Sequence, residues 1–152
     1  MAAAAVVFLF PIGVLDVCHD PSGRLLWRVP VDEGSTVDLA YTNSIFNAPT
    51  VERFVVAGGW LHLVEVLSTS EAVFEYLRLD PPYERRGALL AARTTGPTLE
   101  GFTTRIGQAG QQRLVVDGEE LLLYRIGVGE AVRIVVRRIP LAARWLRRSR
   151  PP

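Results

Sequence analysis

The sequence predicts an all-β protein, a single-domain antiparallel barrel or sandwich of about eight to ten short strands. Turn signals recur about every ten residues along most of the chain. The segments between them are short and rich in Val, Leu, Ile, Phe and Tyr, which is the composition of strands in such folds. No repeat and no long amphipathic helix interrupts this pattern.

Size and composition fit one globular domain with a substantial core. The chain has 152 residues, 49% of them hydrophobic and 22% charged, which argues against disorder. A net charge of +1 gives no general attraction to nucleic acid, and we predict none as a partner. All 17 basic residues are arginine. The absence of lysine excludes a lysine Schiff base, a lysine nucleophile and a P-loop lysine.

Cysteine and histidine are scarce. Cys18 is the single cysteine, so no intramolecular disulfide forms, and His19 and His62 are the two histidines. A standard Cys/His zinc site would therefore need carboxylates. Cys18 and His19 are neighbours on an expected strand and point to opposite faces, so they cannot share a metal. We predict no metal, no cofactor and no catalytic residue set.

Residues 1–13 form a hydrophobic N-terminal segment, a candidate signal or anchor. Its apolar run has the length of a signal-peptide core and is short for a membrane span. No arginine precedes it and no small-x-small cleavage site follows. An alternative is that Val14 to Val17 already begins the first strand, after an imperfect anchor. We expect an exported or membrane-anchored protein, with a cytoplasmic location left open.

The β domain is expected over residues 14–139. Its first half reads as alternating strands and turns, with Asp20–Gly23, residues 32–35 and Gly58-Gly59 as turns. The expected strands of this half lie at 14–19, 24–31, 35–44, 51–56 and 60–68. On the last of these, alternation places Trp60, His62, Val64 and Val66 on one face.

The second half is less regular. Residues 71–79 fit either a strand or two turns of helix, and the two prolines of 80–87 indicate a loop. Further strands are expected at 100–107, 111–116, 121–126 and 131–139. Residues 140–152 form a basic C-terminal tail, which is either a membrane-surface or partner-docking helix or a solvated chain end.

The stretch "YTNSIFNAPTVERF", residues 41–54, holds two polar residues where the strand pattern calls for apolar ones. A hairpin centred between Asn47 and Ala48 would pair Leu39 with Val56, Tyr41 with Phe54, and Asn43 with Glu52. All six side chains would then share the inner face, with the polar pair at its loop end. Such a carboxyl group needs a donor, water or a ligand. Asn43 and Glu52 either satisfy each other as a turn clasp or form a small polar site.

The same stretch resembles the domain-of-unknown-function family numbered 1850. Members carry a Tyr-x-His-Ser motif followed by Pro, Glu and Phe, and the corresponding residues are Tyr41, Asn43, Ser44, Pro49, Glu52 and Phe54. The layout is similar from about Val14 to Ile139. The resemblance implies a small, exported or membrane-anchored bacterial protein, an accessory to a tripartite ATP-independent (TRAP) transporter of the TAXI type. The family histidine is Asn43 here, which cannot titrate and favours binding or structure over catalysis.

Three functions remain open at this stage. The first is a non-enzymatic accessory or binding module linked to such a transporter, or to a small carboxylate ligand. Its candidate ligand-binding residues are Tyr41, Asn43, Ser44, Glu52 and Phe54. The second is a small hydrolase or metal-dependent enzyme that uses Glu52. The third is a structural protein that docks through a strand edge and the basic tail.

Overall fold

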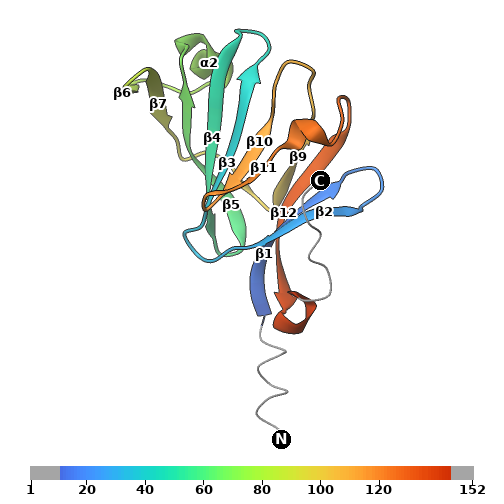
Figure 1. Ribbon diagram of the computed structural model, residues 1–152. Coiled ribbons are helices and arrows are strands. Elements are labelled where there is room, and N and C mark those ends of the chain that lie inside the picture. Colours follow the sequence, from blue (N-terminus) through green and yellow to red (C-terminus); the bar gives the residue numbers. More distant parts are fainter. Residues whose placement is uncertain (1–10, 145–152) are drawn as a thin grey trace, which may run out of the picture.

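The protein is described by a computed structural model over residues 11–144, and it folds into two antiparallel sheets (Figure 1). The smaller sheet has the strand order β2 (Leu25–Pro30), β1 (Pro11–His19), β12 (Ala131–Pro140), β9 (Gly101–Arg105). The larger has the order β11 (Glu119–Leu121), β10 (Arg113–Val116), β3 (Thr36–Asn43), β4 (Ala48–Ala57), β5 (Trp60–Ser68), β7 (Leu89–Arg93), β6 (Glu84–Arg86). Strand β8 (Thr98–Leu99) pairs with β5 beside this path.

The two sheets share one hydrophobic core. Leu15, Trp27 and Ile134 of the smaller sheet and Val37 and Leu39 of the larger sheet belong to the same buried cluster. Across this interface the rings of Phe54 and Phe102 stack with their centroids 5.1 Å apart. The all-β prediction is therefore confirmed, in a sandwich-like form whose larger sheet keeps two separate edges, β11 and β6.

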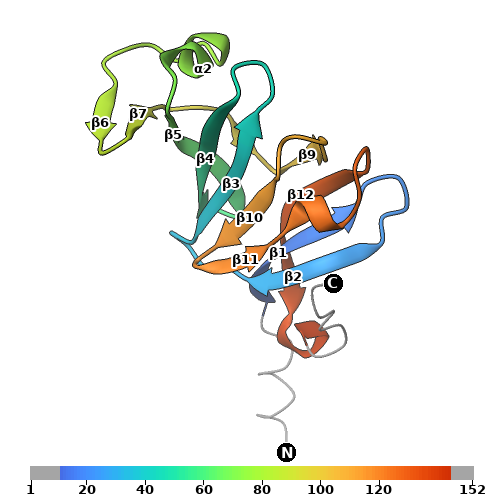
Figure 2. The same cartoon turned by 45° about the horizontal axis from the view of Figure 1, so that its top comes forward.

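A short helix covers the far end of the larger sheet. Helix α2 (Glu71–Tyr76) decides between the two expectations for this segment in favour of helix. It packs Phe74 onto Val66, Leu90 and Ala92, a second buried cluster separate from the main core. Figure 2 shows α2, β6 and β7 projecting beyond the region where the smaller sheet lies.

A bulge in β5 lets this strand contribute to both clusters. Phe54 pairs with Leu63 and Arg53 with Glu65, which leaves Val64 as the extra residue. Leu61 and Val66 are consequently both buried on the inner side, although strict alternation would separate them. The expected common face of Trp60, His62, Val64 and Val66 is therefore wrong beyond His62.

Two further expectations need correction. Residues 121–126 do not continue as a strand, because the chain turns into a 3-10 helix, η1 (Leu123–Arg125), that buries Leu123 in the core. The expected loop at 80–87 contains β6, which pairs with β7 once the prolines have passed. The first hairpin and its turn match the predictions, and the first strand includes Val14 to Val17 but begins earlier, at Pro11, within the segment expected to precede the β domain. A second 3-10 helix, η2 (Leu141–Arg144), begins the expected tail, whose last residues lie outside the described part.

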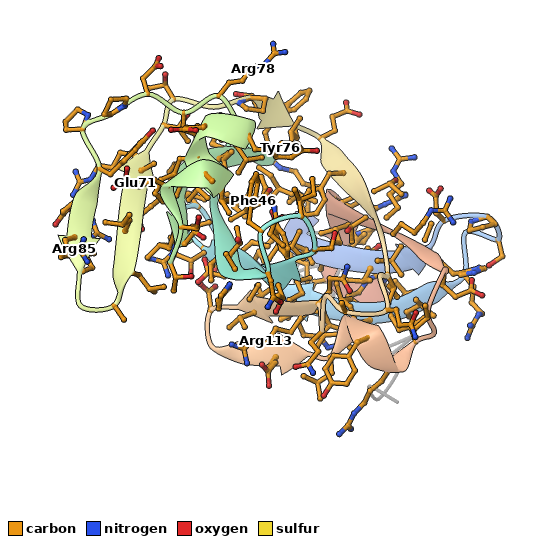
Figure 3. All side chains as sticks on the ribbon, turned by 90° about the horizontal axis from the view of Figure 1, so that it is seen from above. Phe46, Glu71, Tyr76, Arg78, Arg85 and Arg113 are labelled. Carbon is orange, nitrogen blue, oxygen red and sulfur yellow. The ribbon has the colours of Figure 1, made fainter. Side chains whose placement is uncertain are left out.

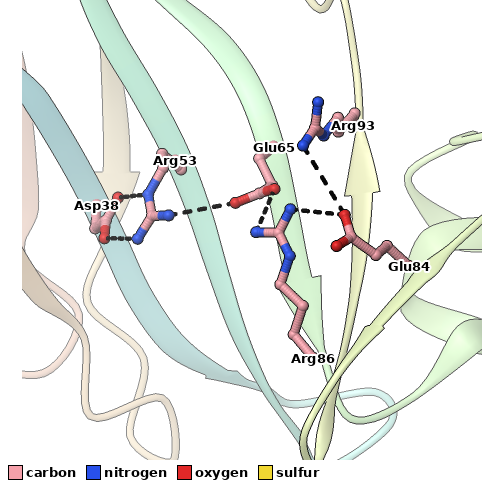
Figure 4. A network of polar contacts seen from close by, with 6 residues as sticks. All are labelled: Asp38, Arg53, Glu65, Glu84, Arg86 and Arg93. Carbon is pink, nitrogen blue, oxygen red and sulfur yellow. Dashed lines mark hydrogen bonds and ion pairs between the residues drawn. The ribbon is translucent and has the colours of Figure 1, made fainter.

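Charged residues on the outer face of the larger sheet are paired in a chain. Arg53 bridges Asp38 and Glu65, and Arg86 connects Glu65 to Glu84 (Figure 4). Glu65, which is nearly buried, thus meets two guanidinium groups at 3.3 and 2.8 Å. On the smaller sheet, buried Asp16 accepts two hydrogen bonds from Arg28, at 2.6 and 2.7 Å. Buried carboxylates outside the candidate site are therefore neutralised by arginine.

Candidate functional site

The hairpin at residues 41–54 forms with a different register from the expected one. Asn43 faces Ala48, Tyr41 faces Thr50, and Leu39 faces Glu52. The chain turns over Ser44–Asn47, two residues earlier than expected, and Asn47 takes a left-handed backbone conformation with φ of 49°. Asparagine tolerates this conformation well, which allows the tighter turn. Because the shift is even, the inner-face residues stay on the inner face.

Asn43 serves the turn and has no contact with Glu52. Its side-chain Oδ1 accepts hydrogen bonds from the backbone N–H groups of Ile45, at 3.0 Å, and Phe46, at 3.3 Å. The residue is only 8% exposed, so these bonds satisfy a buried polar group. Ser44 lies in the exposed turn, and Phe54 is buried in the main core. Of the five candidate residues, the structure joins Tyr41 and Glu52.

The Tyr41 phenol donates a hydrogen bond to Oε1 of Glu52 at 2.6 Å. Tyr41 sits opposite Thr50, and Glu52 is the next inward residue on β4, so the bond runs diagonally between the strands. Both side chains are half-buried. Glu52 lies at the boundary between the two hydrophobic clusters, because its partner on β3, Leu39, belongs to the first cluster and its partner on β5, Val66, belongs to the second.

Burial sets the acid–base properties of this pair. It raises the pKa of Glu52 above the ordinary value of 4.5, and the hydrogen bond from Tyr41 offsets part of that rise. The pKa of Tyr41 is raised strongly, first by burial, then by the negative charge of Glu52 and the hydrogen bond to it, and finally by Tyr76. Within the described residues, no arginine or histidine forms an ion pair with Glu52, in contrast to Asp16 and Glu65.

Two exposed aromatic side chains meet at the β3–β4 turn, and one of them, Tyr76, is close enough to Tyr41 to contribute to its raised pKa. Phe46, from the β3–β4 turn, and Tyr76, from the end of α2, meet edge to face with ring centroids 6.1 Å apart (Figure 3). They are 37% and 58% exposed, which is high for residues of this size. Neither was a candidate from the sequence, because their contact depends on how α2 packs against the sheet. The sequence offers one signal for them, which is an aromatic residue in a turn and another at the end of a short helix, where polar residues are more common.

A separate hollow of about 780 Å³ lies on another side of α2. Its lining contains charged residues of both signs, namely Glu71, Glu75, Asp80, Arg78 and Arg85. These residues are exposed or half-exposed and contain no unpaired buried group. The half-buried carboxyl group of Glu52, which has no arginine or histidine partner among the described residues, therefore makes the Tyr41–Glu52 pair the stronger candidate, and Tyr41 also lines a hollow of about 430 Å³.

The arrangement suits binding better than covalent catalysis. Tyr41 stays protonated at neutral pH because its pKa is raised, so it is a hydrogen-bond donor and not a phenolate nucleophile. Both histidines are engaged elsewhere, His19 with Ser22 and Glu130, and His62 with Ala57 and Thr98. Over residues 11–144, no group of three or more His, Cys, Asp or Glu side chains is placed to hold a metal ion.

Comparison with known proteins found no matching family model, no matching curated protein and no matching solved structure. The resemblance to the domain-of-unknown-function family accordingly stays a prediction from the residues of the hairpin. Among the described helices, none has the length and apolar character needed to cross a membrane.

Proposed function

We propose that this protein is a non-enzymatic binding module and that its ligand contacts the Tyr41–Glu52 pair. One observation carries the proposal: Glu52 is a half-buried carboxyl group with a raised pKa, held by a tyrosine and by no cation. Such a group lowers the stability of the folded state when it ionises, and it is a common feature of functional sites.

The surroundings favour an organic ammonium group as the ligand. A cation would balance the negative charge of Glu52, which has no arginine or histidine partner among the described residues, and the ring of Tyr41, which is bonded to Glu52, offers a face for cation–π contact. The small carboxylate expected from the sequence would bind only beside protonated Glu52, because two carboxylates repel each other. The link to a TRAP transporter of the TAXI type is part of this proposal through the sequence resemblance, since solute binding suits such an accessory.

The two alternative functions have less support. An enzyme that uses Glu52 would require a nucleophile, a histidine or metal ligands beside it, and Tyr41 is its hydrogen-bonding side chain in the described structure. A docking protein would use a strand edge, and the two edge strands of the larger sheet, β6 and β11, are only three residues long each. Short edges are the usual protection against strand addition.

Thermal unfolding with tetramethylammonium chloride tests the proposal, with sodium chloride at equal concentration as reference. A ligand that binds only the folded state raises its stability by about 2.7 kcal/mol at a hundredfold excess over Kd. We expect this stabilisation in the native chain and in Glu119→Gln, which removes an exposed carboxylate at the start of β11. Glu52→Gln should lose it. Equal stabilisation of Glu52→Gln and the native chain would refute the role of Glu52.

A further inference from the structure

A second hollow, of about 460 Å³, lies at the end of the molecule opposite the β3–β4 turn. Its lining includes Trp60 from the β4–β5 turn and Arg133, Arg137 and Arg138 from β12, with Glu100 at the start of β9. Figure 1 shows this lower end, where β1 begins and β12 ends.

The hollow exists because β12 extends beyond the residue at which its antiparallel partner β9 begins. Their pairing ends at Val135 with Gly101, while β12 continues to Pro140. The last contact is the Val136 N–H bonded to the carbonyl of Glu100 at 3.3 Å. Since N–H groups alternate sides along a strand, the N–H of Arg138 points to the same open edge. Backbone and side chain of Arg138 can therefore both donate to a group bound there.

The charge of the hollow is positive. Its lining includes three arginines and one acidic residue, Glu100, with Arg137 and Arg138 on opposite faces of β12 at its unpaired edge. Arg137 also lies 3.8 Å from Asp16, but Asp16 already accepts two shorter bonds from Arg28. The carboxylate of Asp16 therefore pairs mainly with Arg28, and its interaction with the more distant Arg137 is weaker. Arginine clusters of this kind bind phosphate oxygens through charge-assisted hydrogen bonds.

Trp60 gives the hollow an aromatic rim. It is 41% exposed, although the other tryptophan of the described residues, Trp27, is buried in the core. An indole with an apolar body and one N–H donor is most stable at the boundary between lipid and water. Arginine and tryptophan together are the side-chain types that contact lipid headgroups.

The first described strand begins and the last one ends at this end of the fold. Pro11, at the start of β1, pairs with Pro140, at the end of β12. A smaller hollow of about 300 Å³ is lined by Pro11 and Arg138 together with two acidic residues, Asp32 and Glu33, so Arg133 and Arg137 are the arginines of the cluster that lie away from these carboxylates. In sequence, residues 2–10 are entirely apolar and the last six residues include Arg147, Arg148 and Arg150. An apolar segment and a basic segment are the two signals that together hold a protein on a membrane.

We infer that the hollow formed by Trp60, Arg133, Arg137 and Arg138 binds the phosphate group of an anionic lipid. The protein then lies on an anionic membrane surface with this end toward the lipid. The Tyr41–Glu52 pair, at the opposite end of the larger sheet, faces away from the membrane. This inference does not depend on the proposed ammonium ligand, and each can fail without the other.

Sedimentation of the full chain with vesicles tests the inference. Vesicles contain phosphatidylcholine alone or phosphatidylcholine with about one third phosphatidylglycerol. We expect Arg133→Gln/Arg138→Gln to weaken binding to the anionic vesicles about 25-fold, roughly fivefold for each arginine near the surface. Arg93→Gln/Arg113→Gln is the matched control, because it removes the same charge from exposed residues of the larger sheet. It should change binding by less than about twofold.

Three results would overturn the inference. Equal weakening by both double variants would show general charge attraction, and no weakening by either would show that the arginine hollow is not used. Binding of inorganic phosphate by the full chain without binding to the anionic vesicles would show a site for free phosphate and not for a lipid. Since Arg133 and Arg138 are exposed, the variants should retain the native melting curve, which confirms that loss of binding is not loss of folding.

Discussion

Tyr41 and Glu52 share a hydrogen bond of 2.6 Å, although neither residue is the other's cross-strand partner. The bond crosses diagonally from β3 to β4 at the boundary of the two buried clusters. It places a phenol donor on a carboxyl group that other polar side chains of the hairpin do not reach. The behaviour of this pair under substitution and pH provides the first two predictions.

Glu52→Gln should stabilise the protein at pH 8 and change little at pH 4. Burial raises the pKa of Glu52 in the folded state above 4.5, so the folded state binds its proton more tightly than the unfolded state. The resulting stability is fully present below pH 4.5 and is lost as the pH rises through the folded pKa. Urea unfolding of both proteins at the two pH values measures the difference. A Glu52→Gln variant less stable than the native chain at pH 8 would show that the ionised carboxylate is a stabilising group.

Tyr41→Phe should raise the pKa of Glu52 further. The hydrogen bond from Tyr41 favours the ionised carboxylate and lowers the pKa, so its removal leaves burial unopposed. The lost bond should also cost about 1 kcal/mol of unfolding free energy. Carbon-13 NMR of the Glu52 carboxyl group across a pH titration gives the pKa directly. An unchanged pKa would mean that the bond is not formed in solution.

Asn43→Ala should destabilise the fold without affecting the ligand site. The substitution leaves the N–H groups of Ile45 and Phe46 without their side-chain acceptor, which should cost about 1 kcal/mol. Asn43→Asp keeps an oxygen in the same place and should retain most of the stability. Chemical unfolding of both variants, with tetramethylammonium binding as a second measurement, separates the two roles. Loss of binding in Asn43→Ala at temperatures where it is folded would place Asn43 in the site.

Arg28→Ala should be strongly destabilising. Asp16 is 2% exposed and would keep only the more distant Arg137, at 3.8 Å. An uncompensated buried carboxylate of this kind costs about 3–5 kcal/mol. The second substitution Asp16→Asn removes the charge and should recover part of the loss in urea unfolding. If Arg28→Ala/Asp16→Asn is no more stable than Arg28→Ala, then lost packing of the arginine side chain, and not the buried charge, explains the effect.

Much of the fold is predictable from alternation and turn residues. The strands around Asp20–Gly23 and Gly58-Gly59 form where the pattern places them, because each turn is marked by glycine or proline. The β3–β4 register was wrong because its turn relies on a left-handed Asn47, and that conformation is not readable from residue types alone. The bulge at Val64 carries no sequence signal either, since valine fits a regular strand equally well.

The candidate site was predictable in part. Tyr41 and Glu52 were selected because two-residue periodicity puts both on the inner face, and an even register error preserves that face. The assignment of Asn43 as the partner of Glu52 depended on the register and failed with it. Phe46 and Tyr76 could not be found, because their contact arises from the packing of α2 through Phe74 onto a distant strand.

Strand β5 should tolerate the loss of Val64 better than the loss or gain of a residue elsewhere along its length. Without this extra residue Phe54 would still pair with Leu63 and Arg53 with Glu65, so regular pairing would keep Glu65 on the outer face and Val66 on the inner face. The cluster beneath α2 would keep Val66, and the main core would keep Leu61. An inserted residue, in contrast, would turn the side chains that follow it to the opposite face. The bulge is therefore the place where β5 can be shortened by one residue without changing which side chains enter the two clusters.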